Sequence, residues 1–156
     1  MATRGFEFAY MLDGSNAVPL VRDFVLGAAA AHKIGDLMLI QSDGYADQVT
    51  GSTTEVTGVM MEAIAAADIT AGTTNGKMAV ITRNQVWKCS TDAATAATAL
   101  VGTVKTWDTV DANTIDASDV SSGGMIVVEL PDTTALDEDG NIVGYVVFAD
   151  TTFGNA

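Results

Sequence analysis

Apolar residues in this chain occur in short runs separated by residues typical of turns. Between residues 35 and 83 the runs cover residues 37–40, 45–49, 55–64 and 77–82. Asp43-Gly44 separates the first two runs, because glycine supplies the positive φ that a tight hairpin requires. Runs of this length, bounded by Gly, Asp, Asn and Ser, predict strands. We therefore expect an all-β fold with an antiparallel core.

The remainder of the chain continues this pattern. Further strands are predicted at residues 85–89, 101–110, 114–115, 125–130 and 142–149. We expect residues 77–82 and 85–89 to form a hairpin around Arg83-Asn84. Gly58, inside the run 55–64, indicates a bulge or a close backbone approach. Residues 90–100 are the one segment with helical propensity, and a loop of small residues is the alternative that the composition favours almost as much.

The N-terminal segment alternates apolar and polar residues. Phe6, Phe8, Tyr10 and Leu12 would share one face of an extended strand, and such a face needs a partner surface. Residues 1–26 are interpreted either as the first hairpin of the fold or as an extended N-terminal arm that pairs with another subunit. Residues 27–156 would then form a β-barrel-like core domain.

Charge and composition narrow the possible partners. The chain has 20 acidic and 7 basic residues and a net charge of -13, which disfavours binding to nucleic acid or to a membrane surface. Residues 91–156 contain 11 of the acidic residues and one basic residue, Lys105. No signal peptide is recognisable, and the lone Cys89 excludes an intramolecular disulfide, so we expect synthesis in the cytoplasm.

Candidate catalytic and metal-binding residues are few. Cys89 and the only histidine, His32, could form a dyad, but packing roles are favoured for both. One Cys and one His supply too few ligands for zinc. The acidic turn that contains Asp137, Asp139 and Asn141 is interpreted as a hairpin turn, with calcium binding as the alternative. We predict no enzymatic activity, no cofactor and no metal.

The region from residue 33 to residue 90 resembles the small proteins that decorate, or cement, the capsids of tailed bacteriophages. The resemblance rests on four stretches: GDLMLIQSDGYADQV, VTGVMMEAI, AAADITAG and GKMAVITRNQVWKC. It implies a small antiparallel β-barrel or β-tulip-like domain, commonly a homotrimer, that binds the major capsid protein at the virion capsid surface and stabilises the head. The extra length at the N-terminus and in residues 91–124 leaves the symmetry and the mode of attachment open.

Under this interpretation the termini make the contacts to the capsid or to other subunits. The expected contact residues are Arg4, Phe6, Phe8, Tyr10, Leu12, Arg22 and Phe153. Deletion of residues 2–12 is expected to weaken attachment and to leave the core folded. The alternative function is a virion surface module that contacts carbohydrate or a host surface through an exposed ring of Trp87, Trp107 or Tyr45.

Overall fold

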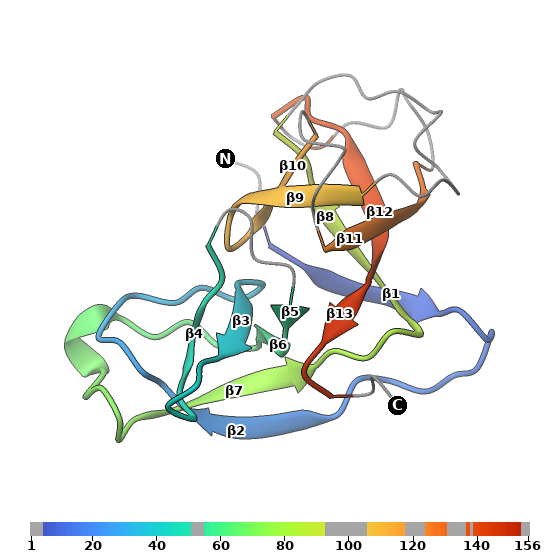
Figure 1. Ribbon diagram of the computed structural model, residues 1–156. Helices are drawn as coiled ribbons and strands as arrows, with labels where there is room; N and C mark the ends of the chain where they lie inside the picture. The colour runs from blue at the N-terminus through green and yellow to red at the C-terminus, as the bar shows by residue number, and fades with distance from the viewer. Residues whose placement is uncertain are drawn as a thin grey trace.

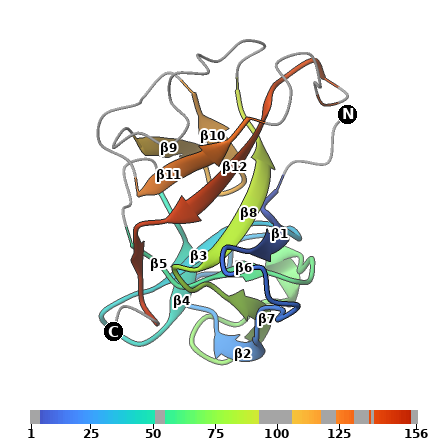
Figure 2. The ribbon, with the colours of Figure 1, turned by 90° about the vertical axis from the view of Figure 1, so that its right-hand side faces the viewer.

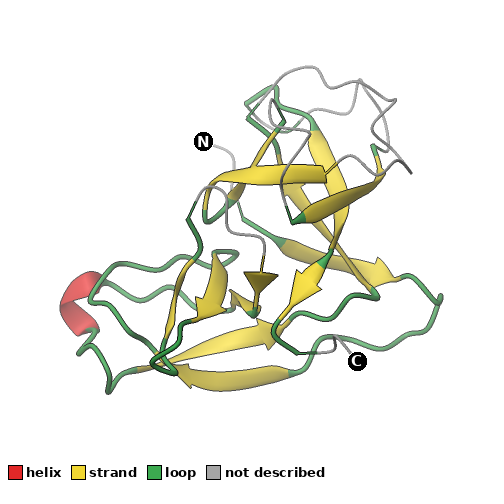
Figure 3. Cartoon of the chain, viewed as in Figure 1, coloured by secondary structure: helices red, strands yellow, loops and turns green. Residues whose placement is uncertain are grey.

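The computed structural model describes residues 5–50, 55–92, 106–117, 124–130, 137 and 139–153. These residues form thirteen strands and one 3-10 turn, η1 (Ala66–Asp68), so the predicted all-β class is confirmed (Figure 3). The strands are β1 (Glu7–Met11), β2 (Val21–Val25), β3 (Leu37–Ile40), β4 (Ala46–Gln48), β5 (Glu55–Val56), β6 (Gly58–Met60), β7 (Asn75–Val80), β8 (Gln85–Ser90), β9 (Thr106–Asp111), β10 (Thr114–Asp116), β11 (Met125–Glu129), β12 (Val143–Phe148) and β13 (Asp150–Thr151).

Two antiparallel sheets make up most of the fold (Figures 1 and 2). The five-stranded sheet has the order β2-β7-β6-β3-β4, and the six-stranded sheet has the order β1-β8-β12-β11-β9-β10. A short parallel pair, β13 with β5, lies beside them. A parallel bridge between Thr91 and Ile115 brings β10 back toward the end of β8. The six-stranded sheet therefore curls, but the described strands form two larger sheets and the β13–β5 pair, with no single closed barrel.

The strands β3 and β6 of the five-stranded sheet have a buried core on each face, which explains their continuous apolar runs. Leu37 and Val59 enter a large core between the sheets, which also contains Trp87. Their neighbours Met38 and Met60 point to the opposite face and enter a second, smaller core. Successive side chains alternate across a strand, so a strand with a core on each side needs apolar residues at every position.

The predicted hairpin around Arg83-Asn84 is wrong in its pairing. Both strands exist, and the Gln85 amide donates to the Thr82 carbonyl at 3.2 Å, so the chain does turn there. However, β7 pairs with β2 and β6, whereas β8 pairs with β1 and β12. The connection is therefore the corner at which the chain leaves one sheet for the other. Sequence-adjacent strands pair often, but nothing in the local pattern distinguishes a hairpin from such a corner.

The N-terminal segment contributes one edge strand to each sheet. β1 pairs with β8, and β2 pairs with β7, so these two strands do not form a hairpin with each other. They are built into the same two sheets as residues 27–153, with Phe6 and Met11 buried. Residues 5–26 are thus integrated into the fold in this chain, and no separate arm projects from the described part.

Several local predictions are confirmed. The turn at Asp43-Gly44 joins β3 to β4 as a hairpin. The predicted extended piece at residues 114–115 is β10. Gly58 marks a close approach, since a Cβ built on it would lie 2.6 Å from the Ala79 carbonyl oxygen.

The run 55–64 is shorter than expected, because it divides into β5 and β6 and ends at Met60. Residues 93–105, which include most of the segment with helical propensity, lie outside the described residues.

Candidate functional site: two apolar grooves beside the N-terminal strands

An apolar groove of about 520 Å³ lies where the two sheets meet beside the N-terminus. We call it the inter-sheet groove. The six-stranded sheet contributes Phe8 and Trp87, and the five-stranded sheet contributes Val21 and Ala79. Glu7 is the only charged residue among its described lining residues. Figure 1 shows how β1 and β2, joined by a long connection, flank this side of the molecule.

A second groove, also of about 520 Å³, lies on the other side of the same connection. We call it the tail groove, because Phe153 from the C-terminal tail lines it together with Val18, Leu20 and Arg22. Val18 lines both grooves. Beyond it, Pro19 and Val21 line the inter-sheet groove, whereas Leu20 and Arg22 line the tail groove. This alternation follows from the extended backbone, which directs successive side chains to opposite sides.

The exposed apolar side chains of the described residues concentrate at these two grooves. Nine large hydrophobic residues are exposed, and six of them line one or both grooves: Val18, Leu20, Val21, Ile34, Met61 and Phe153. The other three are Tyr10, Leu12 and Tyr45. Scattered exposed hydrophobics are ordinary, but a grouped set is typical of an interaction surface. We call the two grooves and their lining the apolar face.

The predicted shared face of Phe6, Phe8, Tyr10 and Leu12 is not formed. A bulge lies between Phe8 and Tyr10, because their partners on β8, Trp87 and Val86, are adjacent residues. One extra residue reverses the alternation of the strand. Phe6 therefore points inward and Tyr10 and Leu12 point outward, while Met11 is buried.

The predicted contact residues accordingly divide into core and surface. Phe6 is 3% exposed and packs its ring 5.6 Å from that of Phe148, so it is a core residue and not the exposed side chain that was expected, although it also lines the inter-sheet groove. Phe8 is half-buried, with its ring edge-on to Trp87 at 5.7 Å, and it lines the inter-sheet groove. Leu12 is 52% exposed but lines neither groove.

Tyr10, Arg22 and Phe153 lie at the surface, and Arg4 lies outside the described residues. The Tyr10 hydroxyl donates to Glu129 Oε1 at 3.3 Å. Partial burial raises the pKa of Tyr10, and the negative charge of Glu129 raises it further. Phe153 is exposed, and its ring centroid lies 6.4 Å from that of Phe24. Phe153 and Arg22 thus meet in the tail groove, far along the sequence from each other.

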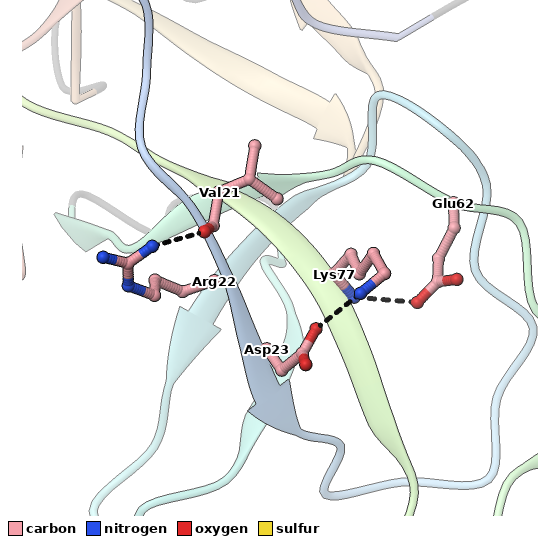
Figure 4. A network of polar contacts seen from close by, with 5 residues as sticks. All are labelled: Val21, Arg22, Asp23, Glu62 and Lys77. Atoms are coloured by element: carbon pink, nitrogen blue, oxygen red, sulfur yellow. Dashed lines mark hydrogen bonds and ion pairs between the residues drawn. The ribbon is translucent and has the colours of Figure 1, made fainter.

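Polar contacts along β2 and β7 border the apolar face (Figure 4). Arg22 Nη1 donates to the carbonyl of Val21 at 2.9 Å. Lys77 Nζ forms an ion pair with Asp23 at 3.2 Å, and the Lys77 amide donates to Glu62 at 2.8 Å. The Asp23–Lys77 pair is more than half exposed, so it contributes at most about 1 kcal/mol. These contacts hold the edge of the sheet but form no cluster that could carry chemistry.

The candidate residues for catalysis and for metal binding have structural surroundings. The Cys89 thiol is buried and donates to the Asn113 carbonyl at 3.2 Å. Asp137 Oδ1 accepts the amides of Asp139 and Asn141, as expected of a hairpin turn. Among the residues that the structure describes, no group of three or more His, Cys, Asp or Glu side chains is placed to hold a metal ion.

His32 is the least satisfied of these candidates. It is 3% exposed, and within the described chain neither ring nitrogen has a hydrogen-bond partner. Burial lowers the pKa of His32, and the nearby carboxylates of Asp36 and Asp47 oppose this effect without reversing it. The backbone of His32 is fixed by two hydrogen bonds with Ile64. The side chain therefore serves as a buried, neutral packing group.

The rings proposed for a glycan-binding module do not gather at one place. Trp87 is 1% exposed, so its ring cannot serve as an exposed stacking platform. Tyr45 is 36% exposed and lies against Gly72, away from both grooves. The side chain of Trp107 is outside the described part. Neither of the two described rings, Trp87 and Tyr45, is therefore an exposed ring at a groove; the exposed ring that does line a groove is that of Phe153.

Five of the six exposed hydrophobic residues of the apolar face were not anticipated from the sequence: Val18, Leu20, Val21, Ile34 and Met61. Val18 and Val21 belong to AVPLV, a run that is apolar at successive positions. An edge segment normally exposes one of its two faces to solvent. A run of successive apolar residues in such a segment therefore indicates that both faces are buried or contact a partner. Ile34 and Met61 carry no comparable signal, since they reach the groove only through the folding of distant loops.

Comparison of the chain with protein families, with curated proteins and with solved structures finds no match. Among the described residues, no helix is long and apolar enough to cross a membrane.

Proposed function

We propose that this protein is a structural virion protein that decorates a bacteriophage capsid and stabilises it by binding across joints between major capsid protein subunits. The observation that carries this proposal is the apolar face, where six of the nine exposed large hydrophobics of the described residues lie together. The sequence resemblance to capsid decoration proteins supports the choice of partner. A homotrimer located on the capsid surface is part of the proposal.

The character of the apolar face favours a binding role over a catalytic one. Its described lining contains only two charged residues, Glu7 and Arg22, and these lie in different grooves. General acid–base and nucleophilic catalysis need a reacting group with a second titratable group in reach. A surface with isolated charges and grouped apolar side chains can instead exclude water against a partner.

The net charge of -13 also suits a protein held at high density on a capsid. Like charges oppose non-specific association of the protein in solution, and an apolar face of limited extent then determines where the protein attaches. Attachment would add buried area across shell joints, and a partner that binds only the assembled shell stabilises that shell by mass action.

Capsid co-sedimentation tests the proposal. The capsids are assembled from the major capsid protein encoded in the same genome, and the protein is added with its tail groove intact or altered. Full burial of a leucine or phenylalanine side chain contributes about 1.5–3 kcal/mol, and Leu20 and Phe153 are each about half exposed before binding. The double variant Leu20→Ser and Phe153→Ser should therefore lose about 2 kcal/mol, roughly thirtyfold in affinity.

Tyr45→Ser is the matched control, because Tyr45 is a partly exposed ring that lines neither groove. It should sediment with capsids as the unaltered protein does. Unaltered protein that stays in the supernatant at every capsid concentration would refute the proposed function. Deletion of residues 2–12 is not a suitable test, because it would remove the core residues Phe6 and Met11 together with β1.

A further inference from the structure

We infer that the inter-sheet groove binds an extended, apolar segment of a partner protein, flanked by basic residues, which pairs with the outer edge of β1 at Phe8. The inference deepens the proposed function, since it names the kind of segment that the capsid partner would offer. The groove and the edge of β1 do not depend on the identity of the partner, because any extended apolar peptide with basic ends would fit them.

The edge of β1 provides backbone groups for pairing. β1 is the terminal strand of the six-stranded sheet, with β8 on its inner side. The Phe6 amide donates at 2.8 Å to the carbonyl of Gly35, which lies on the outer side. Because backbone groups alternate along a strand, the amide and carbonyl of Phe8 also point outward, toward the groove that Phe8 lines. An added strand would therefore find a donor and an acceptor at Phe8.

The shape of the groove suits an extended chain. Its volume of about 520 Å³ is within the range of ligand pockets, roughly 300–1,000 Å³. Small-molecule sites rely on several converging polar groups, whereas the described wall of this groove offers Glu7 as its only charged side chain. A strand needs fewer side-chain contacts, because main-chain bonds supply part of the affinity and alternate apolar side chains fill the groove.

Two glycines keep one end of the groove open. Gly5 and Gly35 both line it, and their backbones cross so closely that a Cβ on Gly35 would lie 2.6 Å from the Gly5 Cα. Gly35 also has a φ of 94°, which side chains other than glycine rarely adopt. The local backbone thus leaves no side chain to fill this end of the groove.

The negative charge of the protein favours basic residues on either side of the apolar segment that binds. The chain carries a net charge of -13, and Glu7 at the groove has a side chain that is 72% exposed. Lys88 approaches Glu7 at 3.5 Å but is itself partly exposed, so this ion pair is solvent-screened and leaves the Glu7 carboxylate accessible to a basic residue of a partner. A segment with basic residues at both ends would be attracted to the groove, whereas a second copy of this chain docked in the groove would bring a further net charge of -13 against it.

Peptide binding to the full chain tests the inference. The probe is a ten-residue peptide with two lysines at each end and six alternating valines and threonines between them, and its twin carries glutamates in place of the lysines. Binding is followed by amide chemical shifts and by hydrogen exchange at Phe8. We expect saturable binding of the lysine peptide below about 1 mM, slower exchange at Phe8, and at least tenfold weaker binding of the glutamate peptide.

Two neighbouring substitutions provide the matched control. Val21→Glu places a charge in the inter-sheet groove, and Leu20→Glu places the same charge in the tail groove. Both residues are about half exposed, at 43% and 53%, so neither change disturbs the core. Val21→Glu should reduce peptide affinity at least tenfold, and Leu20→Glu should change it less than twofold.

Absence of saturable binding at about 1 mM, no change in exchange at Phe8, or equal effects of the two substitutions would overturn the inference. Capsid co-sedimentation separates this result from the proposed function. If the protein sediments with capsids but does not bind the peptide, the groove inference fails and the capsid proposal stands. If the protein binds the peptide but does not sediment with capsids, the groove inference stands and the capsid proposal fails.

Discussion

Asp36 joins the two sheets through its buried carboxylate, and its removal should be costly. The residue is 1% exposed and precedes β3. Oδ2 accepts the Lys33 amide at 2.8 Å and Gln48 Nε2 at 2.7 Å, and Oδ1 accepts Asn113 Nδ2 at 3.1 Å. Gln48 lies on β4 of the five-stranded sheet, whereas Asn113 lies between β9 and β10 of the six-stranded sheet. One side chain therefore bonds to both sheets.

The magnitude follows from these three hydrogen bonds. A hydrogen bond to a charged group contributes about 1.5–3 kcal/mol net, and a buried donor that loses its partner has a desolvation cost of its own. The donors from Gln48 and Asn113 belong to partly buried side chains, so after loss of Asp36 they can form hydrogen bonds to water, which reduces the cost. We therefore expect Asp36→Ala to lower the free energy of unfolding by about 3–4 kcal/mol, a large share of the roughly 5–15 kcal/mol of an ordinary domain.

Urea unfolding followed by circular dichroism measures this change. Asp43→Ala is the control, because Asp43 is exposed and its carboxylate accepts the Tyr45 amide in a turn, at 3.0 Å. It should cost less than about 1 kcal/mol. If Asp36→Ala cost no more than Asp43→Ala, with equal m-values, Asp36 would not link the sheets and the reasoning would be wrong.

Three further predictions concern the core. Phe148→Ala removes a ring that is 1% exposed and packs against Phe6, so it should lower the free energy of unfolding by about 3–5 kcal/mol in the same urea assay. Gly58→Ala should cost more than about 2 kcal/mol, since its Cβ would meet backbone at 2.6 Å; a loss below 0.5 kcal/mol would contradict this close approach. Burial lowers the pKa of His32 below 6.5, so the unfolded chain binds the proton more tightly than the folded protein does. The free energy of unfolding should therefore fall as the pH drops below about 6.5, and His32→Asn should lose this pH dependence. Urea midpoints measured between about pH 5.5 and 7.5 would show the difference.

The sequence predicted strand positions better than strand partners. Apolar runs bounded by turn residues located β3, β4, β7 and β8, because local patterning determines which segments are extended. The partner of each strand depends on contacts between distant residues. The corner between β7 and β8 has the same composition as a hairpin turn, and only the cores on both sides of β7 determine that β8 leaves the sheet.

The candidate site was predictable in part, for the same reason. The exposure of Leu12 and Phe153 was anticipated, and so was the surface position of Arg22. The burial of Phe6 was not, because the strict alternation from Phe6 to Leu12 holds only for a strand without a bulge. Ile34 and Met61 join the apolar face through tertiary folding alone, so no local pattern identifies them.

Hydrogen exchange of the protein bound to capsids tests the central claim most directly. The account predicts that binding slows exchange at Phe8 on the outer edge of β1 and along residues 18–22, which separate the two grooves. The turn at residues 41–45, which lines neither groove, should exchange at the same rate in the free and bound protein. Protection at residues 41–45 with none at Phe8 or at residues 18–22 would contradict the assignment of the apolar face as the attachment surface.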